Sequence, residues 1–223
     1  YSLINHNLIY NNKSINRYKL NSNLSIKGVK GKDLLKLKEE ISKIKNCALK
    51  KNSNNIVFSD GSPHSQIMII GEGPGSNEDL DGVPFVGRAG ELLDKMLDSI
   101  NLNRDNVYIT NVVNYRPPDN RNPTEVEIQK YLPYLIRHIE IINPKILILL
   151  GSTSLNALIG NEKIISEIRG NWIKKKIGRC VTSIIVSFHP SFLIRQPSQK
   201  ALAWIDLKMI RKKINDLKIK IDK

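Results

Sequence analysis

Residues 66–100 predict a buried strand, a glycine-rich loop and a helix, in that order. The apolar run 67–70 lies between turn-forming residues, which is typical of a short strand inside a sheet. The loop that follows, residues 71–90, has the sequence GEGPGSNEDLDGVPFVGRAG. From Arg88 to Ile100 the apolar side chains recur at helical spacing. In open α/β sheets the loops after such strands form the ligand crevice, so this loop is the first candidate for a functional site.

Strands and helices alternate along the rest of the chain. We expect further strands at residues 107–113, 145–150 and 182–188, separated by amphipathic helices. A hairpin is expected over residues 169–182, with Gly178 near its turn. The aliphatic run 145–150 is typical of a parallel strand that is covered on both faces. The pattern predicts a doubly wound α/β fold on four strands, with right-handed crossovers.

The chain of 223 residues is long enough for one α/β domain, which we assign to residues 31–223. Residues 1–30 are rich in Asn, Ser and Lys without a sustained hydrophobic period, which predicts a weakly ordered arm. A formal net charge of +14 favours a polyanionic partner, with nucleic acid as the first candidate. A lysine-rich source proteome would give the same excess, so charge alone does not decide between the two causes.

Membrane insertion and a disulfide framework are not expected. No apolar run reaches the roughly 18 residues that span a bilayer, and no signal peptide is recognisable, which predicts a cytoplasmic protein. The two cysteines, Cys47 and Cys180, lie far apart in the sequence, which argues against a framework of disulfides.

Polar residues accompany the ends of three of the four predicted strands. Glu72 and Gly73 follow the first strand, Asn111 lies near the end of the second, and His189 follows the last. Because the carboxyl ends of parallel strands meet at one edge of a sheet, we expect these residues to converge in one crevice. With the ring of Phe85 beside them, they suit a small planar ligand with an amide-like edge, such as a nucleobase.

Each of these residues, taken singly, also fits a different role. Gly71 and Gly73 form half of a dinucleotide-binding fingerprint, but Ser76 occupies the position of its third glycine. The carboxylates of the loop, Glu78 among them, would repel a pyrophosphate. Asn111 alone is compatible with a turn or capping role, and a single histidine at a strand end is often structural. Their joint occurrence favours a binding site.

Three motifs resemble those of family 4 uracil-DNA glycosylases, members of the uracil-DNA glycosylase superfamily. They are residues 71–90, residues 110–123 (TNVVNYRPPDNRNP) and residues 189–195 (HPSFLIR), and the resemblance covers about residues 35–215. It implies a three-layer α/β/α sandwich on a short, mainly parallel four-stranded sheet. It also implies a monomeric, nucleoid-associated enzyme that flips uracil out of DNA and hydrolyses its N-glycosidic bond in base-excision repair.

The resemblance assigns substrate contacts to the predicted crevice. Phe85 would stack on the flipped uracil, Asn111 would read its Watson–Crick edge, and His189 would bind its O2 atom. The backbone N–H of Gly73 would be a second donor to the negative charge that develops on the uracil ring.

Two carboxylates complete the implied catalytic set. Glu72 and Glu78 would line the pocket, stabilise the sugar cation and position the attacking water. Which of the two orients the water stays open, and Glu78 would alternatively exclude thymine at the C5 position of the base.

The segment 189–195 is implied to be the loop that enters DNA. Leu193 and Ile194 would wedge into the space left by the flipped base, and nearby arginines would bind phosphates. Ordinary core packing is the alternative role for these two apolar residues. The residues implied to contact DNA are Arg116, Arg121, Ser191, Leu193, Ile194 and Arg195.

The sequence departs from the family at the positions that hold an iron–sulfur cluster. Family 4 enzymes usually bind a [4Fe–4S] cluster through four cysteines. The corresponding positions here are Ile44, Cys47, Tyr115 and Tyr131, so one thiol of four is kept. Cys180 lies in the predicted hairpin and cannot replace three missing ligands. We therefore predict an enzyme without this cluster or another metal cofactor.

Two further functions remain open besides uracil excision. The same scaffold would suit another deaminated base, or a DNA-binding domain with weakened or lost catalysis. Covalent trapping on DNA is disfavoured, because residues 88–92 continue directly into the predicted helix without an inserted histidine.

Overall fold

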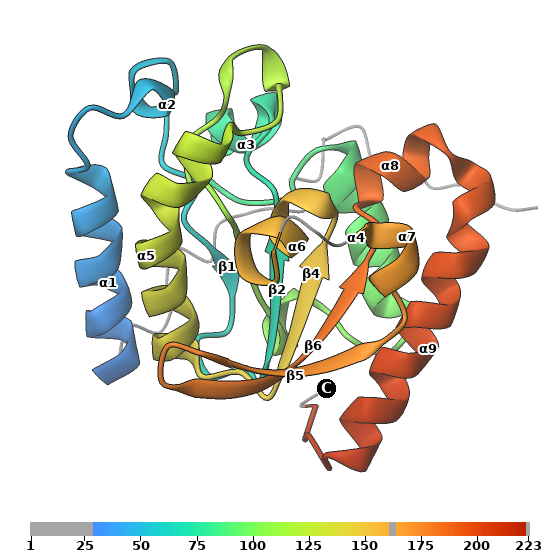
Figure 1. Cartoon of the computed structure of the whole chain (residues 1–223). Helices are drawn as coiled ribbons and strands as arrows, with labels where there is room; N and C mark the ends of the chain where they lie inside the picture. Colours follow the sequence, from blue (N-terminus) through green and yellow to red (C-terminus); the bar gives the residue numbers. More distant parts are fainter. Residues whose placement is uncertain (1–28, 161–163, 222–223) are drawn as a thin grey trace, which may run out of the picture.

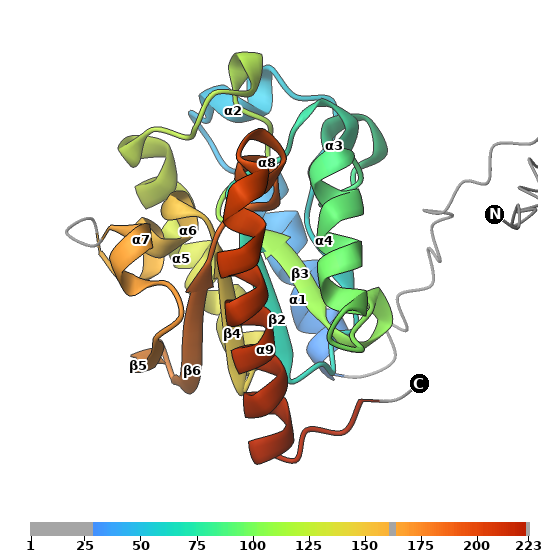
Figure 2. The same cartoon turned by 90° about the vertical axis from the view of Figure 1, so that its right-hand side faces the viewer.

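One six-stranded sheet with helices on both faces forms the described part of the protein (Figures 1 and 2). The computed structural model describes residues 29–160 and 164–221. The four inner strands are parallel, and the two edge strands pair antiparallel with their neighbours, in the order β1-β3-β2-β4-β6-β5. The strands are β1 (Asp60–Gly61), β2 (Ile67–Gly71), β3 (Tyr108–Asn111), β4 (Ile146–Leu150), β5 (Trp172–Ile177) and β6 (Cys180–Ser187).

The predicted α/β fold is confirmed, but the sheet has six strands where four were expected. Strand β1 spans two residues within a loop, which is too short to give a period-two pattern. Strand β5 is the first arm of the predicted hairpin. It joins the main sheet because β6 runs without a break through the hairpin's second arm and the last expected strand. Gly178, with a φ of +52°, lies in the turn between them.

Helix α1 begins at Val29, so residues 29 and 30, which were expected in the arm, belong to this helix. Residues 1–28 of the predicted arm lie outside the described part. None of the described helices is long and apolar enough to cross a membrane. The α-helices are α1 (Val29–Ser42), α2 (Ala48–Lys51), α3 (Ser76–Asp81), α4 (Arg88–Asp98), α5 (Glu125–Ile142), α6 (Ser152–Leu158), α7 (Ile165–Ile168), α8 (Pro190–Arg195) and α9 (Lys200–Asp216), and the 3-10 helices are η1 (Arg104–Asn106), η2 (Pro118–Asn120) and η3 (Pro197–Gln199).

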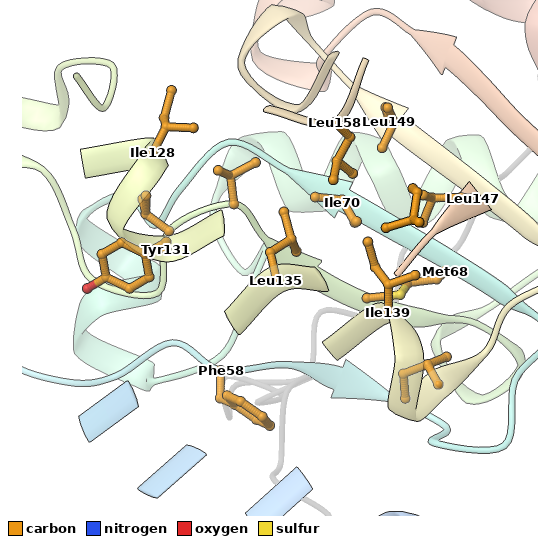
Figure 3. Close-up of a cluster of buried hydrophobic side chains, with 14 of the residues drawn as sticks. Phe58, Met68, Ile70, Ile128, Tyr131, Leu135, Ile139, Leu147, Leu149 and Leu158 are labelled. Atoms are coloured by element: carbon orange, nitrogen blue, oxygen red, sulfur yellow. The ribbon is translucent and has the colours of Figure 1, made fainter. Parts of the chain in front are cut away.

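Two hydrophobic clusters, one on each face of the sheet, hold the layers together. Successive side chains of a strand point to opposite faces, so Met68 and Ile70 pack under α1, α5 and α6 (Figure 3), while Ile67 and Ile69 pack under α4 and α9. The strand Ile146–Leu150 is buried along its whole length, as predicted for a parallel strand covered on both sides. Helices α4 and α8 lie on the opposite side of the sheet from α1 and α5 (Figure 1).

Helix α5 starts with a capping box formed by Thr124 and Glu127. The Thr124 hydroxyl accepts a hydrogen bond from the Glu127 N–H at 3.3 Å, and the Glu127 carboxylate accepts one from the Thr124 N–H at 2.7 Å. This box fixes the start of the helix directly after the motif 110–123, and therefore fixes where that motif leaves the sheet.

Candidate active site

The carboxyl ends of the inner strands surround one cavity of about 430 Å³. Gly71, the last residue of β2, pairs in register with Asn111, the last residue of β3, so the segments that follow both strands lie side by side. His189 comes two residues after the end of β6 and lines the same cavity. The structure thus brings together the set expected from the sequence, which comprises Glu72, Gly73, Glu78, Phe85, Asn111 and His189.

Asn111 presents a buried acceptor that has no partner among the described residues. Its side chain is 3% exposed, and its Oδ1 atom receives no hydrogen bond from the protein. A buried polar atom without a partner is unfavourable by about 1–3 kcal/mol, so such atoms concentrate where a ligand supplies the missing group. A Cβ atom at Gly71 would lie 2.4 Å from Oδ1, which explains why a glycine ends β2.

Phe85 forms an apolar wall of the cavity in an unusual backbone conformation. Its φ is +57°, in the left-handed region that non-glycine residues rarely adopt. Its ring stacks on the imidazole of His189 with centroids 5.5 Å apart and planes inclined by 30°. The ring also covers Gly71, where an added Cβ would lie 2.5 Å from the Phe85 Cζ atom.

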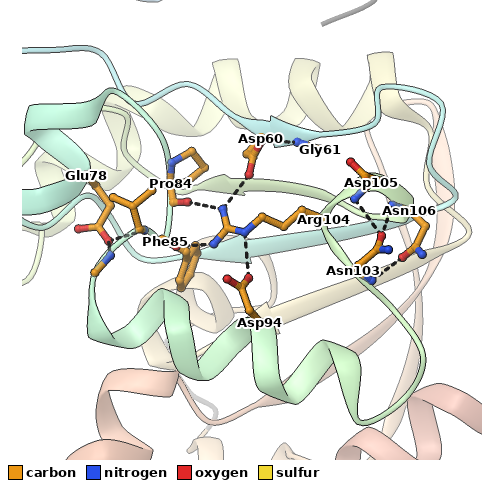
Figure 4. A network of polar contacts seen from close by, with 12 residues as sticks. Asp60, Gly61, Glu78, Pro84, Phe85, Asp94, Asn103, Arg104, Asp105 and Asn106 are labelled. Atoms are coloured by element: carbon orange, nitrogen blue, oxygen red, sulfur yellow. Dashed lines mark hydrogen bonds and ion pairs between the residues drawn. The ribbon is translucent and has the colours of Figure 1, made fainter. Parts of the chain in front are cut away.

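Arg104 holds the backbone of the Phe85 loop, and sequence reasoning missed it. Its guanidinium donates to the carbonyls of Pro84 and Phe85 and forms ion pairs with Asp60 at 2.7 Å and Asp94 at 2.9 Å (Figure 4). These contacts join β1, α4 and the loop through one side chain, which stabilises the strained conformation at Phe85. An arginine between two predicted elements carries no local signal for this role.

Glu78 uses both carboxylate oxygens to hold backbone. It accepts hydrogen bonds from the N–H groups of Gly75 at 3.1 Å, Val86 at 2.9 Å and Gly87 at 2.9 Å. These bonds clamp the start of α3 to the loop that carries Phe85. Glu78 lines the cavity, but its protein contacts leave it less free than Glu72 to orient a water molecule.

Glu72 is held by one oxygen only. The Thr153 hydroxyl donates to its Oε2 atom, and its Oε1 atom has no protein partner in the described part of the chain. Burial raises the pKa of Glu72, while the Thr153 hydrogen bond and the charge of Arg195 act in the opposite direction. The Oε1 atom of Glu72 is thus a carboxylate oxygen at the cavity that makes no hydrogen bond with the described residues.

His189 is neutral near pH 7 and presents its Nε2 as a donor. Burial, followed by the charge of Arg195, lowers the pKa of His189 to about 4. The Nδ1 atom accepts a hydrogen bond from the Ser191 N–H at 3.2 Å and lies 2.8 Å from the Ser191 hydroxyl. With Nδ1 as the acceptor, the single proton of the neutral ring belongs on Nε2. The Gly73 N–H, also at the cavity, makes no hydrogen bond among the described residues.

The segment 190–195, expected as a loop, forms helix α8 with His189 as its N-cap. Leu193 is 1% exposed and belongs to the core cluster under α4 and α9, which agrees with the alternative role of core packing, and its contact with DNA stays a prediction. Ile194 is half-buried, and the exposed Arg195 and the half-buried Ser191 both line the cavity.

The two arginines of the second motif differ in position. Arg121 lines the cavity, where its guanidinium pairs with both oxygens of Glu127 at 2.8 Å. Arg116 is held by the side chain of Asn120 at 2.8 Å and does not line the cavity. Both arginines belong to the segment that follows β3, but only Arg121 borders the cavity.

The positions expected for a cluster meet in the core under α1 and α5. Cys47, Tyr115 and Tyr131 are buried there, and Ile44 packs against them. The Cys47 Sγ atom lies 3.2 Å from the Tyr131 hydroxyl (Tyr131 is labelled in Figure 3). Burial raises the pKa of both tyrosines, so neither phenol replaces a thiolate ligand at neutral pH. One thiol with two protonated phenols does not fit an iron–sulfur cluster.

The chain matches one protein family over most of its length. The family model described as the uracil DNA glycosylase superfamily matches residues 58–211. The type-4 uracil-DNA glycosylase of Thermotoga maritima is 42% identical over 163 residues, which are 73% of this chain and 83% of the relative.

Two further relatives with the same description come from other organisms. The protein from Sulfurisphaera tokodaii is 41% identical over 183 residues, 80% of this chain and 83% of the relative. The protein from Pyrobaculum aerophilum is 37% identical over 181 residues, 79% of this chain and 92% of the relative. The resemblance stated from the motifs is therefore confirmed, and the chain belongs to the uracil-DNA glycosylase superfamily, among its type-4 members.

Proposed function

We propose that this protein is a monofunctional uracil-DNA glycosylase that acts in base-excision repair without an iron–sulfur cluster. The observation that carries the proposal is the buried Oδ1 atom of Asn111, which has no hydrogen-bond partner among the described residues and lies in the same cavity as the Phe85 ring and the neutral His189. Three segments far apart in the sequence thus offer an acceptor, a flat apolar wall and a donor to one planar ligand. A uracil base extruded from DNA has the matching groups.

Asn111 supplies base selectivity. Its Oδ1 would accept from the N3–H group of uracil, and its Nδ2 would donate to O4. Cytosine presents an acceptor at N3 and a donor at C4, so a fixed amide would leave buried polar groups unpaired against it. Such mismatches reject a ligand strongly because each unpaired group is desolvated without compensation.

Cleavage of the bond between uracil N1 and sugar C1′ separates charge. The electron pair of the bond goes to the uracil ring, and positive charge develops on the sugar. The Nε2–H group of His189 and the N–H group of Gly73 would donate to the developing anion. Removing one such donor from an enzyme typically slows the reaction by ~10²–10³-fold.

Glu72 would act on the sugar side of the bond. Its carboxylate would stabilise the cation, and its unengaged Oε1 would orient a water molecule and accept its proton as the water oxygen bonds to C1′. Glu78 would serve as the clamp that holds the Phe85 loop, since three backbone N–H groups occupy its oxygens. The products would be free uracil and an abasic site.

Cationic side chains at the cavity would bind the DNA backbone. Arg195 is exposed at the end of α8, and the net charge of +14 would attract DNA over a wide area. We assign phosphate contacts to Arg195 and Arg121, and a contact beside the extruded base to Ile194, with the protein acting as a monomer on chromosomal DNA.

The Cys47–Tyr131 core would take over the volume that a cluster fills in other type-4 members. We propose that buried aromatic packing and the contact of 3.2 Å between Sγ and the hydroxyl join α5 to the segment before α2 without a metal. Purified protein would then be colourless and hold no stoichiometric iron after anaerobic preparation. A brown protein with about four irons per chain would contradict this part of the proposal.

Excision from a single-uracil oligonucleotide, followed by alkali cleavage and gel electrophoresis, tests the function. We expect product with the wild type, and losses of at least about 100-fold in the single-turnover rate for Asn111→Ala and His189→Ala. His64→Ala is the matched control, because His64 is exposed in a loop outside the cavity. Tight DNA binding without any product would instead favour a DNA-binding domain, and product only from hypoxanthine or xanthine would favour another deaminated base.

A further inference from the structure

Thr153 connects helix α6 to the candidate catalytic carboxylate. Its hydroxyl lies 2.5 Å from the Oε2 atom of Glu72, and its side chain is 6% exposed. The contact follows from the sheet, because β2 and β4 are neighbours and Ile70 pairs in register with Leu149. The residue after β2 and the first turn of α6 therefore emerge next to each other.

The surroundings of the Glu72 carboxylate affect its ionisation in opposite directions. Burial opposes the charged form of Glu72, while Thr153 and Arg195 favour it. Arg195 is exposed, so solvent and salt screen its effect, whereas the Thr153 hydroxyl is buried. The other charged or titratable groups that line the cavity are Glu78 from α3, Arg121 from the segment after η2, and His189 before α8.

We propose that Thr153 is a positioning residue for Glu72, which holds one carboxylate oxygen and leaves the other for the attacking water. This inference rests on the proposed uracil excision and names a residue that acts through Glu72 without contact to the substrate. A valine has nearly the same shape as threonine but cannot donate a hydrogen bond. The variant Thr153→Val therefore removes the proposed interaction with little change in volume.

The test compares pH profiles of single-turnover uracil excision. In Thr153→Val the acidic limb should move to higher pH by about one unit, because loss of the hydrogen bond disfavours the ionised carboxylate. Affinity for uracil-containing DNA should stay within about twofold of the wild type. Thr153→Ser, which keeps a hydroxyl, should restore the profile.

A neighbouring hydroxyl provides the matched control. Ser154 is also buried in α6, but its hydroxyl bonds to the Gly151 carbonyl at 3.1 Å and not to a carboxylate. Ser154→Ala should leave the acidic limb in place. If Thr153→Val and Ser154→Ala give the same profile as the wild type, the positioning role is wrong.

A second readout separates this inference from the proposed function. Carbon-13 NMR of the Glu72 side-chain carboxyl follows its titration in the free protein and needs no activity. It also distinguishes Glu72 from His189, whose own protonation would affect the acidic limb. A wild type without uracil excision, combined with an upward shift of the Glu72 titration in Thr153→Val or Thr153→Ala, would refute the function and keep the carboxylate–hydroxyl coupling. An unchanged Glu72 titration in both variants would refute the coupling itself.

Discussion

The ring of Phe85 stacks on the imidazole of His189, with centroids 5.5 Å apart, although the two residues lie 104 positions apart in the sequence. The pair forms one continuous wall, in which an apolar ring borders the donor that would face uracil O2. The wall depends on two separate loops, one between α3 and α4 and one after β6. Their alignment therefore depends on the tertiary structure and not on either motif alone.

Phe85→Ala should lower the rate of uracil excision without unfolding the protein. Stacking of a base on an aromatic side chain contributes ~1–3 kcal/mol, which corresponds to a loss of roughly 5–150-fold in kcat/KM. Single-turnover kinetics together with thermal melting would check this. A rate equal to that of the wild type, at unchanged melting temperature, would show that the ring does not contact the base.

Gly71→Ala should abolish excision while leaving DNA binding largely intact. The added Cβ would lie 2.4 Å from the Asn111 Oδ1 atom and 2.5 Å from the Phe85 ring, so the side chains of Asn111 and Phe85 would be displaced. We expect at least about a 100-fold loss of the single-turnover rate. Wild-type activity in a correctly folded Gly71→Ala protein would contradict the described geometry.

Arg104→Lys should destabilise the protein and slow catalysis together. Lysine keeps the charge but cannot reach two carboxylates and two carbonyls at once. The expected loss is about 2–3 kcal/mol in the free energy of unfolding, measured by urea denaturation. Arg179→Lys is the control, because Arg179 is exposed and lies 3.5 Å from Glu140.

Stability should fall as the pH is lowered from about 6.5 towards 4. Burial lowers the pKa of His189 to about 4 and that of His138 to about 3, whereas both groups return to about 6.5 in the unfolded chain. The unfolded state therefore binds more protons in this window, and stability rises with pH there by up to ~1.4 kcal/mol per pH unit for each histidine. Urea denaturation at several pH values checks the slope. His189→Ala should reduce the slope.

Tyr131→Phe should weaken the buried core that contains Cys47 and Tyr131. The variant keeps the ring and loses the hydroxyl that lies 3.2 Å from the Cys47 Sγ atom. We expect a decrease of about 1 kcal/mol in the free energy of unfolding, with uracil excision retained, because Tyr131 does not line the cavity. Loss of uracil excision at an unchanged free energy of unfolding would contradict the purely structural role of the Tyr131 hydroxyl.

The sequence predicted the part of the site that depends on strand order. Glu72, Asn111 and His189 each accompany the end of an apolar run, and parallel strands place such ends together. Motif chemistry added Phe85 and Glu78. The capping box at Thr124 was predictable because it depends on local spacing alone.

Contacts between distant side chains were not predictable from the sequence. Arg104, Thr153 and Asp60 lie in separate elements, and no periodicity or motif links them to the cavity. The role of Leu193 was also not predictable from the sequence, because a short apolar run after a histidine fits both a surface wedge and a core contact. Its place under α4 and α9 depends on how α8 packs, which only the tertiary structure determines.

The most direct measurement is mass-spectrometric detection of the base released from duplexes that carry a single uracil, with thymine and cytosine duplexes as controls. We expect stoichiometric free uracil from the wild type, with neither thymine nor cytosine released, and no uracil from Asn111→Ala over the same time. Equal release by Asn111→Ala, or no uracil from a folded wild type that binds the duplex, would contradict the proposed function.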